Sequence, residues 1–138
     1  LAALAFRPQE FAVGVNIFGV GNWVRTLKSI PAWWEAVREA LYKEIGNPFT
    51  DEEYLRKISP LFHADKITKP IIVLQGANDP RVPPVHSRAL FRALNQYLGV
   101  ATELIVYPGE PHGLTTAENR MAKIHWDLAW FEKYLGSP

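Results

Sequence analysis

Apolar residues are distributed along this chain in two kinds of pattern. Residues 71–75 and 104–107 are short, mainly apolar runs without alternation, which is typical of strands covered on both faces of a parallel sheet. Residues 11–18 instead alternate apolar side chains with smaller or polar ones, and this period of two predicts a further strand. We therefore expect three strands, two of them deeply buried.

Helical repeats surround these strands. Residues 1–7 are expected to be the last turns of a helix that stops at Pro8. Further helices are predicted over residues 31–46, 51–58 and 83–99, because start and stop residues frame apolar positions spaced three and four apart. The segment Thr50-Asp51-Glu52-Glu53 is a capping-box signature for the middle one.

The final helix carries the longest apolar stripe. It is expected to begin at Thr115-Thr116 and to bury one face along its length. The stripe consists of Met121, Ile124, Leu128, Phe131 and Leu135. We expect His125 to pack beside this stripe, and Trp126, Trp130 and Tyr134 to serve as core or interface.

Strands that alternate with helices of this length predict β-α-β units, and hence an α/β fold with a mainly parallel sheet flanked by helices. A chain of 138 residues is long enough to bury one core. It contains no internal repeat and no linker. We treat residues 1–138 as a single α/β domain.

Composition narrows the function classes. The hydrophobic fraction of 48%, with five Trp, five Tyr and seven Phe, indicates a packed globular body. Fifteen Lys and Arg against fourteen Asp and Glu give no electrostatic support for binding nucleic acid or a membrane surface. The absence of Cys excludes disulfides and thiolate nucleophiles. It is compatible with a reducing cytosol, and a cytoplasmic location is our expectation.

Asp79 and His112 are the candidate catalytic residues. Each follows one of the buried strands, and polar residues at the carboxyl ends of parallel strands meet at one edge of the sheet. A histidine there can accept and return a proton near neutral pH, while an acid orients its ring. Taken singly, Asp79 is also a good turn residue and His112 a solvated loop histidine, so the spacing alone leaves the pair and these simpler roles open.

The chain offers no nucleophile to complete a triad. In α/β-hydrolases the order is nucleophile, acid, histidine, with the serine on a Gly-x-Ser-x-Gly elbow. None of the serines (Ser29, Ser59, Ser87 and Ser137) has such flanking glycines. The four histidines are too widely spaced for a metal site. The segment Gly19-Val20-Gly21 lacks the third glycine and the following helix of a dinucleotide-binding site. No cofactor is therefore implied.

Two longer motifs resemble a known family. Residues 72–83, Ile-Val-Leu-Gln-Gly-Ala-Asn-Asp-Pro-Arg-Val-Pro, resemble the acid loop of the prolyl oligopeptidase family of serine peptidases. Residues 107–113, Tyr-Pro-Gly-Glu-Pro-His-Gly, are similar to its histidine loop. The resemblance covers essentially the whole chain, and its nearest branch is dipeptidyl-aminopeptidase-like or acylaminoacyl-peptidase-like.

The resemblance implies the C-terminal half of an α/β-hydrolase domain. Asp79 would be the triad acid, His112 the general base, and Arg81 a substrate-binding residue that holds a carbonyl or carboxylate through its rigid donor fork. For Arg81 a surface salt bridge is the alternative. The elbow, the first strands and any gating propeller would precede Leu1, and since position 1 is not Met we expect the chain to begin inside a larger protein.

The function expected is therefore that of a serine-type peptidase or related esterase, carried here by a fragment that is inactive alone. Its partners would be a peptide or ester substrate and either the missing N-terminal half or a second copy. The alternative is a non-catalytic module that associates with a partner chain through an exposed sheet edge and helix faces.

Overall fold

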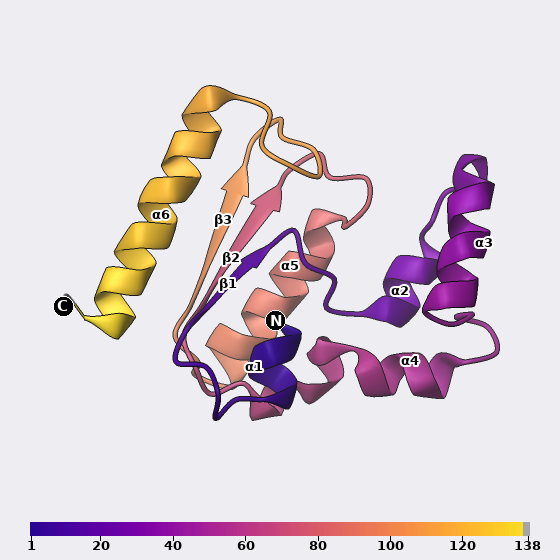
Figure 1. Cartoon of the computed structure of the whole chain (residues 1–138), viewed down its shortest axis with the longest axis horizontal. Coiled ribbons are helices and arrows are strands. Elements are labelled where there is room, and N and C mark those ends of the chain that lie inside the picture. The colour runs from indigo at the N-terminus through magenta and orange to yellow at the C-terminus, as the bar shows by residue number, and fades with distance from the viewer. Residues whose placement is uncertain (137–138) are drawn as a thin grey trace.

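A computed structural model describes residues 1–136. Within them, a parallel sheet has the strand order β1-β2-β3 (Figure 1). The strands are β1 (Gly14–Ile17), β2 (Ile71–Gly76) and β3 (Thr102–Tyr107). Gly14 pairs with Ile71, and Ile71 in turn pairs with Thr102. The predicted α/β fold with a parallel sheet is confirmed.

Helices of three kinds connect the strands. The α-helices are α1 (Ala2–Phe6), α2 (Trp23–Lys28), α3 (Glu35–Glu44), α4 (Glu52–Ile58), α5 (Pro84–Phe91) and α6 (Ala117–Leu135). The 3₁₀ segments are η1 (Ala32–Trp34) and η2 (Pro60–Lys66), and η3 (Arg92–Tyr97) is a π-helical turn that continues α5. The chain leaves this helix at Gly99, whose φ of +67° is the left-handed conformation that favours glycine.

The central strand β2 is buried along its entire length because helices cover both faces of the sheet (Figure 1). Ile71 and Val73 face one layer, which includes α1, η2 and α5. Ile72 and Leu74 face the other, where Trp130 of α6 packs. The continuous apolar run of β2 thus divides its side chains between two cores, as expected for a strand of a doubly covered sheet.

A third apolar cluster lies in the long connection between β1 and β2, where α2, α3 and α4 pack together beside the sheet (Figure 1). Leu27 and Leu55 are at its centre. Helix α2 was not predicted from the sequence. The prediction that no helix follows Gly21 is therefore wrong. The helix begins at Trp23, and the side chain of Asn22 caps it by accepting a hydrogen bond from the Arg25 amide at 3.0 Å.

The predicted burial of the α6 stripe is wrong. All five of its side chains, from Met121 to Leu135, are exposed, and so is His125. The face that packs on the sheet instead carries Trp130, which is buried, with Tyr134 and Ala122 beside it. Of the predicted row at spacing four, Trp130 and Tyr134 thus meet the sheet, whereas Trp126 is exposed.

The start of α4 differs from the capping box that the sequence predicts. Helix α4 is present, but the side chain of its N-cap residue Asp51 accepts a hydrogen bond from the Asn47 amide at 2.8 Å and makes no capping bond. Among residues 1–136, none of the helices combines the length and apolar character that crossing a bilayer requires.

Candidate active site

Two loops lie side by side at the carboxyl ends of β2 and β3. The amide of Ala77 donates to the carbonyl of Tyr107 at 2.9 Å, and the amide of Asn78 donates to the carbonyl of Glu110 at the same distance. These bonds extend the pairing of the two strands beyond the sheet. They bring the loop that carries Asp79 against the loop that carries His112.

Gly76 permits this close approach. A Cβ atom at this position would lie 2.1 Å from the carbonyl oxygen of Pro111 and 2.5 Å from that of Glu110. Both are backbone atoms, so a side chain could be accommodated only by moving the histidine loop away. The separation of the two loops therefore depends on a glycine at the end of β2.

The carboxylate of Asp79 is fully buried and contacts His112. Its Oδ2 atom lies 2.8 Å from Nδ1 of His112, whose side chain is 31% exposed. Its Oδ1 atom accepts from the amides of Arg81 at 2.8 Å and Val82 at 2.9 Å. The expected hydrogen bond between Asp79 and His112 is thus confirmed. Because a carboxylate only accepts, Nδ1 carries the proton and Nε2 is left as the basic nitrogen of the neutral ring.

Glu110 anchors the histidine loop to the start of α6. Its buried carboxylate accepts from the amide and hydroxyl of Thr115 at 2.7 and 2.6 Å, and from the side-chain amide of Asn119 at 2.5 Å. The amide and hydroxyl of Thr116 also donate to it. The side-chain bonds from Thr115 and Asn119 are the largest cause that lowers the pKa of Glu110 from 4.5 to about 2. Because its pKa is lowered, the Glu110 carboxylate that ties the loop to the start of α6 is negatively charged near neutral pH.

Phe18 is a site residue that the sequence reading missed. It follows β1 with a φ of 50°, the left-handed conformation that non-glycine residues seldom adopt. Its ring lies 5.7 Å from the imidazole of His112, measured between ring centroids. A left-handed conformation costs on the order of 1–2 kcal/mol for an L-residue, and no residue type in this segment signals it.

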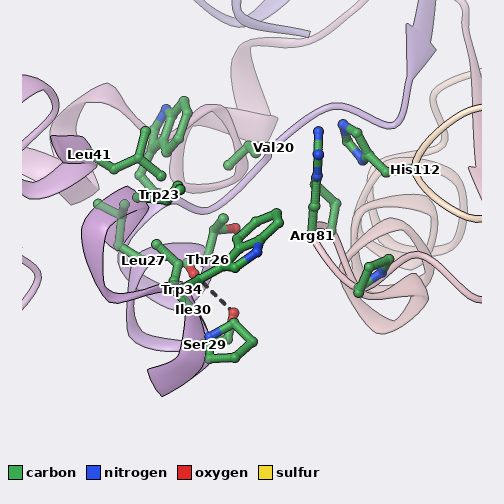
Figure 2. A pocket seen from close by; sticks show the side chains of 14 residues that line it. Val20, Trp23, Thr26, Leu27, Ser29, Ile30, Trp34, Leu41, Arg81 and His112 are labelled. Carbon is green, nitrogen blue, oxygen red and sulfur yellow. Dashed lines mark hydrogen bonds between the residues drawn. The ribbon is translucent and has the colours of Figure 1, made fainter. Parts of the chain in front are cut away.

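An apolar pocket of about 350 Å³ opens beside His112. Figure 2 shows Arg81 and His112 on one side of it, and Trp23, Leu27 and Ile30 of the α2 region on the other. The remaining lining residues are Val20, Thr26, Ser29, Pro31, Trp34, Val37, Leu41, Pro80 and Val82. The connection between β1 and β2 thus builds most of a cavity whose polar edge is formed by Arg81 and His112.

Arg81 lies at the edge of this pocket, as the sequence reading expected. Its guanidinium carbon lies 5.1 Å from the centre of the Trp34 ring, within the range of a cation–π contact. Among residues 1–136 no carboxylate forms a salt bridge with Arg81. The alternative of a structural surface ion pair therefore has no partner in the described part of the chain.

The serines have structural roles where the structure describes them. Ser29 donates to the carbonyl of Thr26 (dashed in Figure 2), Ser59 to that of Leu55, and Ser87 to the side chain of Gln75. Ser137 lies outside the described residues. His86 is buried, and this desolvation, followed by the charge of the nearby Arg25, lowers its pKa. In residues 1–136 none of the serine hydroxyls is hydrogen-bonded to His112.

A parallel sheet with an acid loop and a histidine loop at the ends of adjacent strands defines the α/β-hydrolase class. A solved structure described as a Mycobacterium tuberculosis puromycin-hydrolyzing peptidase superposes with a TM-score of 0.88 at 26% identity. The superposition covers 99% of this chain and 20% of that one. The chain belongs to the prolyl oligopeptidase family, whose pattern it matches over residues 1–138.

Curated relatives agree with this assignment. The chain is 42% identical over 124 residues to dipeptidyl peptidase family member 6 of Caenorhabditis elegans, a match that covers 88% of this chain and 17% of the relative. It is 39% identical over 124 residues to dipeptidyl aminopeptidase BIII of Pseudoxanthomonas mexicana, with 88% and 18% covered. The chain thus spans less than a fifth of the length of either relative.

Proposed function

We propose that this chain supplies the acid and the general base of a serine-type peptidase that cleaves short peptides. The observation that carries the proposal is the 2.8 Å contact between Asp79 Oδ2 and His112 Nδ1 at the edge of an apolar pocket. Membership of the prolyl oligopeptidase family supports it, as do relatives whose names denote a dipeptidyl peptidase and a dipeptidyl aminopeptidase.

The reaction proposed is acyl transfer. Nε2 of His112 takes the proton of a serine hydroxyl while the serine oxygen attacks the carbonyl carbon of the scissile bond. The resulting imidazolium is stabilised by Asp79, which keeps Nδ1–H in a hydrogen bond throughout. The proton then passes from Nε2 to the leaving amine as the C–N bond breaks. Water hydrolyses the acyl-enzyme by the same route, returning a proton to the serine.

The nucleophile would come from a segment outside residues 1–138. The three described serines are engaged elsewhere, and none lies on a glycine-flanked elbow. Such a segment would pack against the surface left uncovered here, where the five apolar side chains of the α6 stripe are exposed and β1 has a strand partner on one side only among the described residues. The 138-residue chain alone would then have no hydrolase activity.

The pocket would receive an apolar side chain of the substrate next to the scissile bond. Trp23, Leu27 and Ile30 give it an apolar wall, and a volume of about 350 Å³ is at the lower end for small-molecule sites. Arg81 at its edge would donate hydrogen bonds to a substrate carbonyl or carboxylate. Since Arg81 contacts the ring of Trp34, the same wall of the pocket would bind both the side chain and a carbonyl group of the substrate.

Steady-state kinetics of the full protein test this function. Peptide substrates that differ only in the side chain at the scissile bond should give kcat/KM values that rise from glycine to leucine or phenylalanine. His112→Ala should lower kcat by roughly 10⁴-fold or more, as loss of a triad histidine does. His125→Ala, which alters an exposed histidine of α6, is the matched control. Equal kcat for the two variants would contradict the proposal.

A further inference from the structure

Gln75 is a polar side chain at the centre of an apolar sheet. It lies in β2, which is buried at all six positions, and its own exposure is 0%. A buried amide that lacks hydrogen-bond partners destabilises a fold by several kcal/mol in apolar surroundings, so the partners of Gln75 explain why it is tolerated here. These partners lead to the catalytic pair.

The side-chain nitrogen of Gln75 faces three oxygen atoms. Nε2 lies 3.0 Å from the carbonyl of Gly76, 3.0 Å from that of Val82 and 3.3 Å from Oδ2 of Asp79. Oδ2 is the same atom that contacts Nδ1 of His112. Gln75 therefore contacts both the acid and the loop whose backbone amides hold the other carboxylate oxygen.

Ser87 binds the opposite end of the Gln75 amide. Its buried hydroxyl, in the first turn of α5, donates to Oε1 of Gln75 at 2.6 Å. Rotating the amide by half a turn would place its oxygen against three acceptors and its nitrogen against the hydroxyl. The three acceptors thus favour the orientation in which Gln75 donates to the carboxylate, and the hydrogen bond from Ser87 holds the amide in it.

We propose that Gln75, held by Ser87, is a positioning residue that holds the carboxylate of Asp79 against His112. The backbone amides of Arg81 and Val82 restrain Oδ1 only. Without Gln75, Oδ2 would be held by His112 alone, the group that must itself change protonation during turnover. The role in catalysis rests on the proposed function; the role in geometry does not.

The geometric claim is tested by proton NMR of the full protein, through the low-field resonance of the His112 Nδ1–H that is bonded to Asp79. Asp79→Asn, which removes the carboxylate, identifies the resonance by its loss. Gln75→Met keeps the length of the side chain and removes the donor, so the resonance should broaden or vanish through faster exchange with water. Ile72→Val, on the same buried strand, lowers stability without touching Asp79 and should leave the resonance in place.

Kinetics test the consequence for turnover. Gln75→Met should lower kcat about tenfold, the effect of one lost hydrogen bond to a charged group, and change KM by less than about twofold. Ser87→Ala, a milder change if Gln75→Met folds poorly, should lower kcat roughly three- to tenfold. Because Ser87 acts through Gln75, the double variant should be no slower than Gln75→Met alone.

The outcomes separate the two proposals. An unchanged resonance together with unchanged kcat in Gln75→Met would overturn the positioning role, and so would additive effects of the two single variants. A resonance that responds to Gln75→Met in a protein that hydrolyses no peptide would support the positioning role while refuting the proposed function.

Discussion

At the scale of single residues, the carboxylate of Asp79 is held by four hydrogen bonds. It is fully buried and accepts hydrogen bonds from two backbone amides, from the Gln75 side chain and from His112. Hydrogen bonds to a buried charged group are stronger than those between neutral groups. The orientation of the His112 ring therefore follows from the acid loop, while the ring remains partly exposed toward the pocket.

Arg81 has a different role at the same scale, and its removal should affect substrate binding without affecting the fold. Its guanidinium stacks on Trp34 at the edge of the pocket. In the full protein, Arg81→Ala should lower kcat/KM for peptides by roughly ten- to a hundredfold, as expected for one charged hydrogen bond of about 1.5–3 kcal/mol.

The matched control is Arg56→Ala. Arg56 also stacks on an aromatic ring, that of Phe62 at 3.9 Å, but it does not line the pocket beside His112. Its removal should leave kcat/KM unchanged. If both arginine variants behave alike on peptide substrates, Arg81 belongs to the protein surface and has no substrate to hold.

The residue scale also shows what the sequence could reveal of the site. Asp79 and His112 were candidates because each follows an apolar run, whereas the role expected of Arg81 came from the resemblance of its loop to the prolyl oligopeptidase family. Gln75 and Phe18 were missed because their roles arise from contacts across the fold, and one of them depends on a backbone angle. A glutamine inside an apolar strand was a usable signal, since a buried amide needs partners.

At the scale of elements, Glu110 joins the histidine loop to helix α6. Five hydrogen bonds from residues at the start of the helix reach its carboxylate, and the same loop carries His112 two residues later. The helix packs on β3 through Trp130. The buried, charged carboxylate of Glu110 therefore fixes the position of the His112 imidazole relative to the sheet.

This connection predicts how stability depends on pH. The pKa of Glu110 is lowered to about 2 in the folded protein from an ordinary value of 4.5, so its contribution is fully present above about pH 4.5. It is lost as the pH falls from there towards 2, because the unfolded chain takes up the proton first. The difference in free energy of unfolding between the wild type and Glu110→Gln should be constant near neutral pH and shrink over that acid range, measured by urea denaturation at successive pH values.

Glu118→Gln is the control, since it removes an exposed carboxylate from the first turn of the same helix. Its free energy of unfolding should stay close to that of the wild type near neutral pH. A difference for Glu110→Gln that stays constant down to about pH 2, or one that grows as the pH falls, would refute the role assigned to Glu110.

The elements themselves were predictable where period and end signals agreed. The three strands, the helix that ends at Gly99 and the final helix were all found. Helix α2 was missed because Gly19 and Gly21 suggested a loop. Asn22, a residue type that commonly caps helices, was a signal in the sequence for its start. The buried face of α6 was wrongly predicted because an exposed aliphatic stripe and a buried one have the same period, and sequence alone does not tell which face meets the sheet.

At the scale of the whole molecule, the fold brings an acid, a base and an apolar pocket to one end of the sheet. Two cores enclose the sheet, and a third supports α2 and α3, which contribute to the wall of the pocket. The same body leaves the apolar stripe of α6 exposed. We attribute the exposure of this stripe to the absence of the proposed segment, which would carry the nucleophile and cover the stripe.

The most direct test of the central claim is to locate the nucleophile. The full protein is treated with a fluorophosphonate probe, digested, and the labelled peptide identified by mass spectrometry. We predict a single labelled serine outside residues 1–138, with labelling abolished by His112→Ala, and no label on the 138-residue chain alone. A label on Ser29, Ser59, Ser87 or Ser137, or labelling that survives His112→Ala, would contradict the claim.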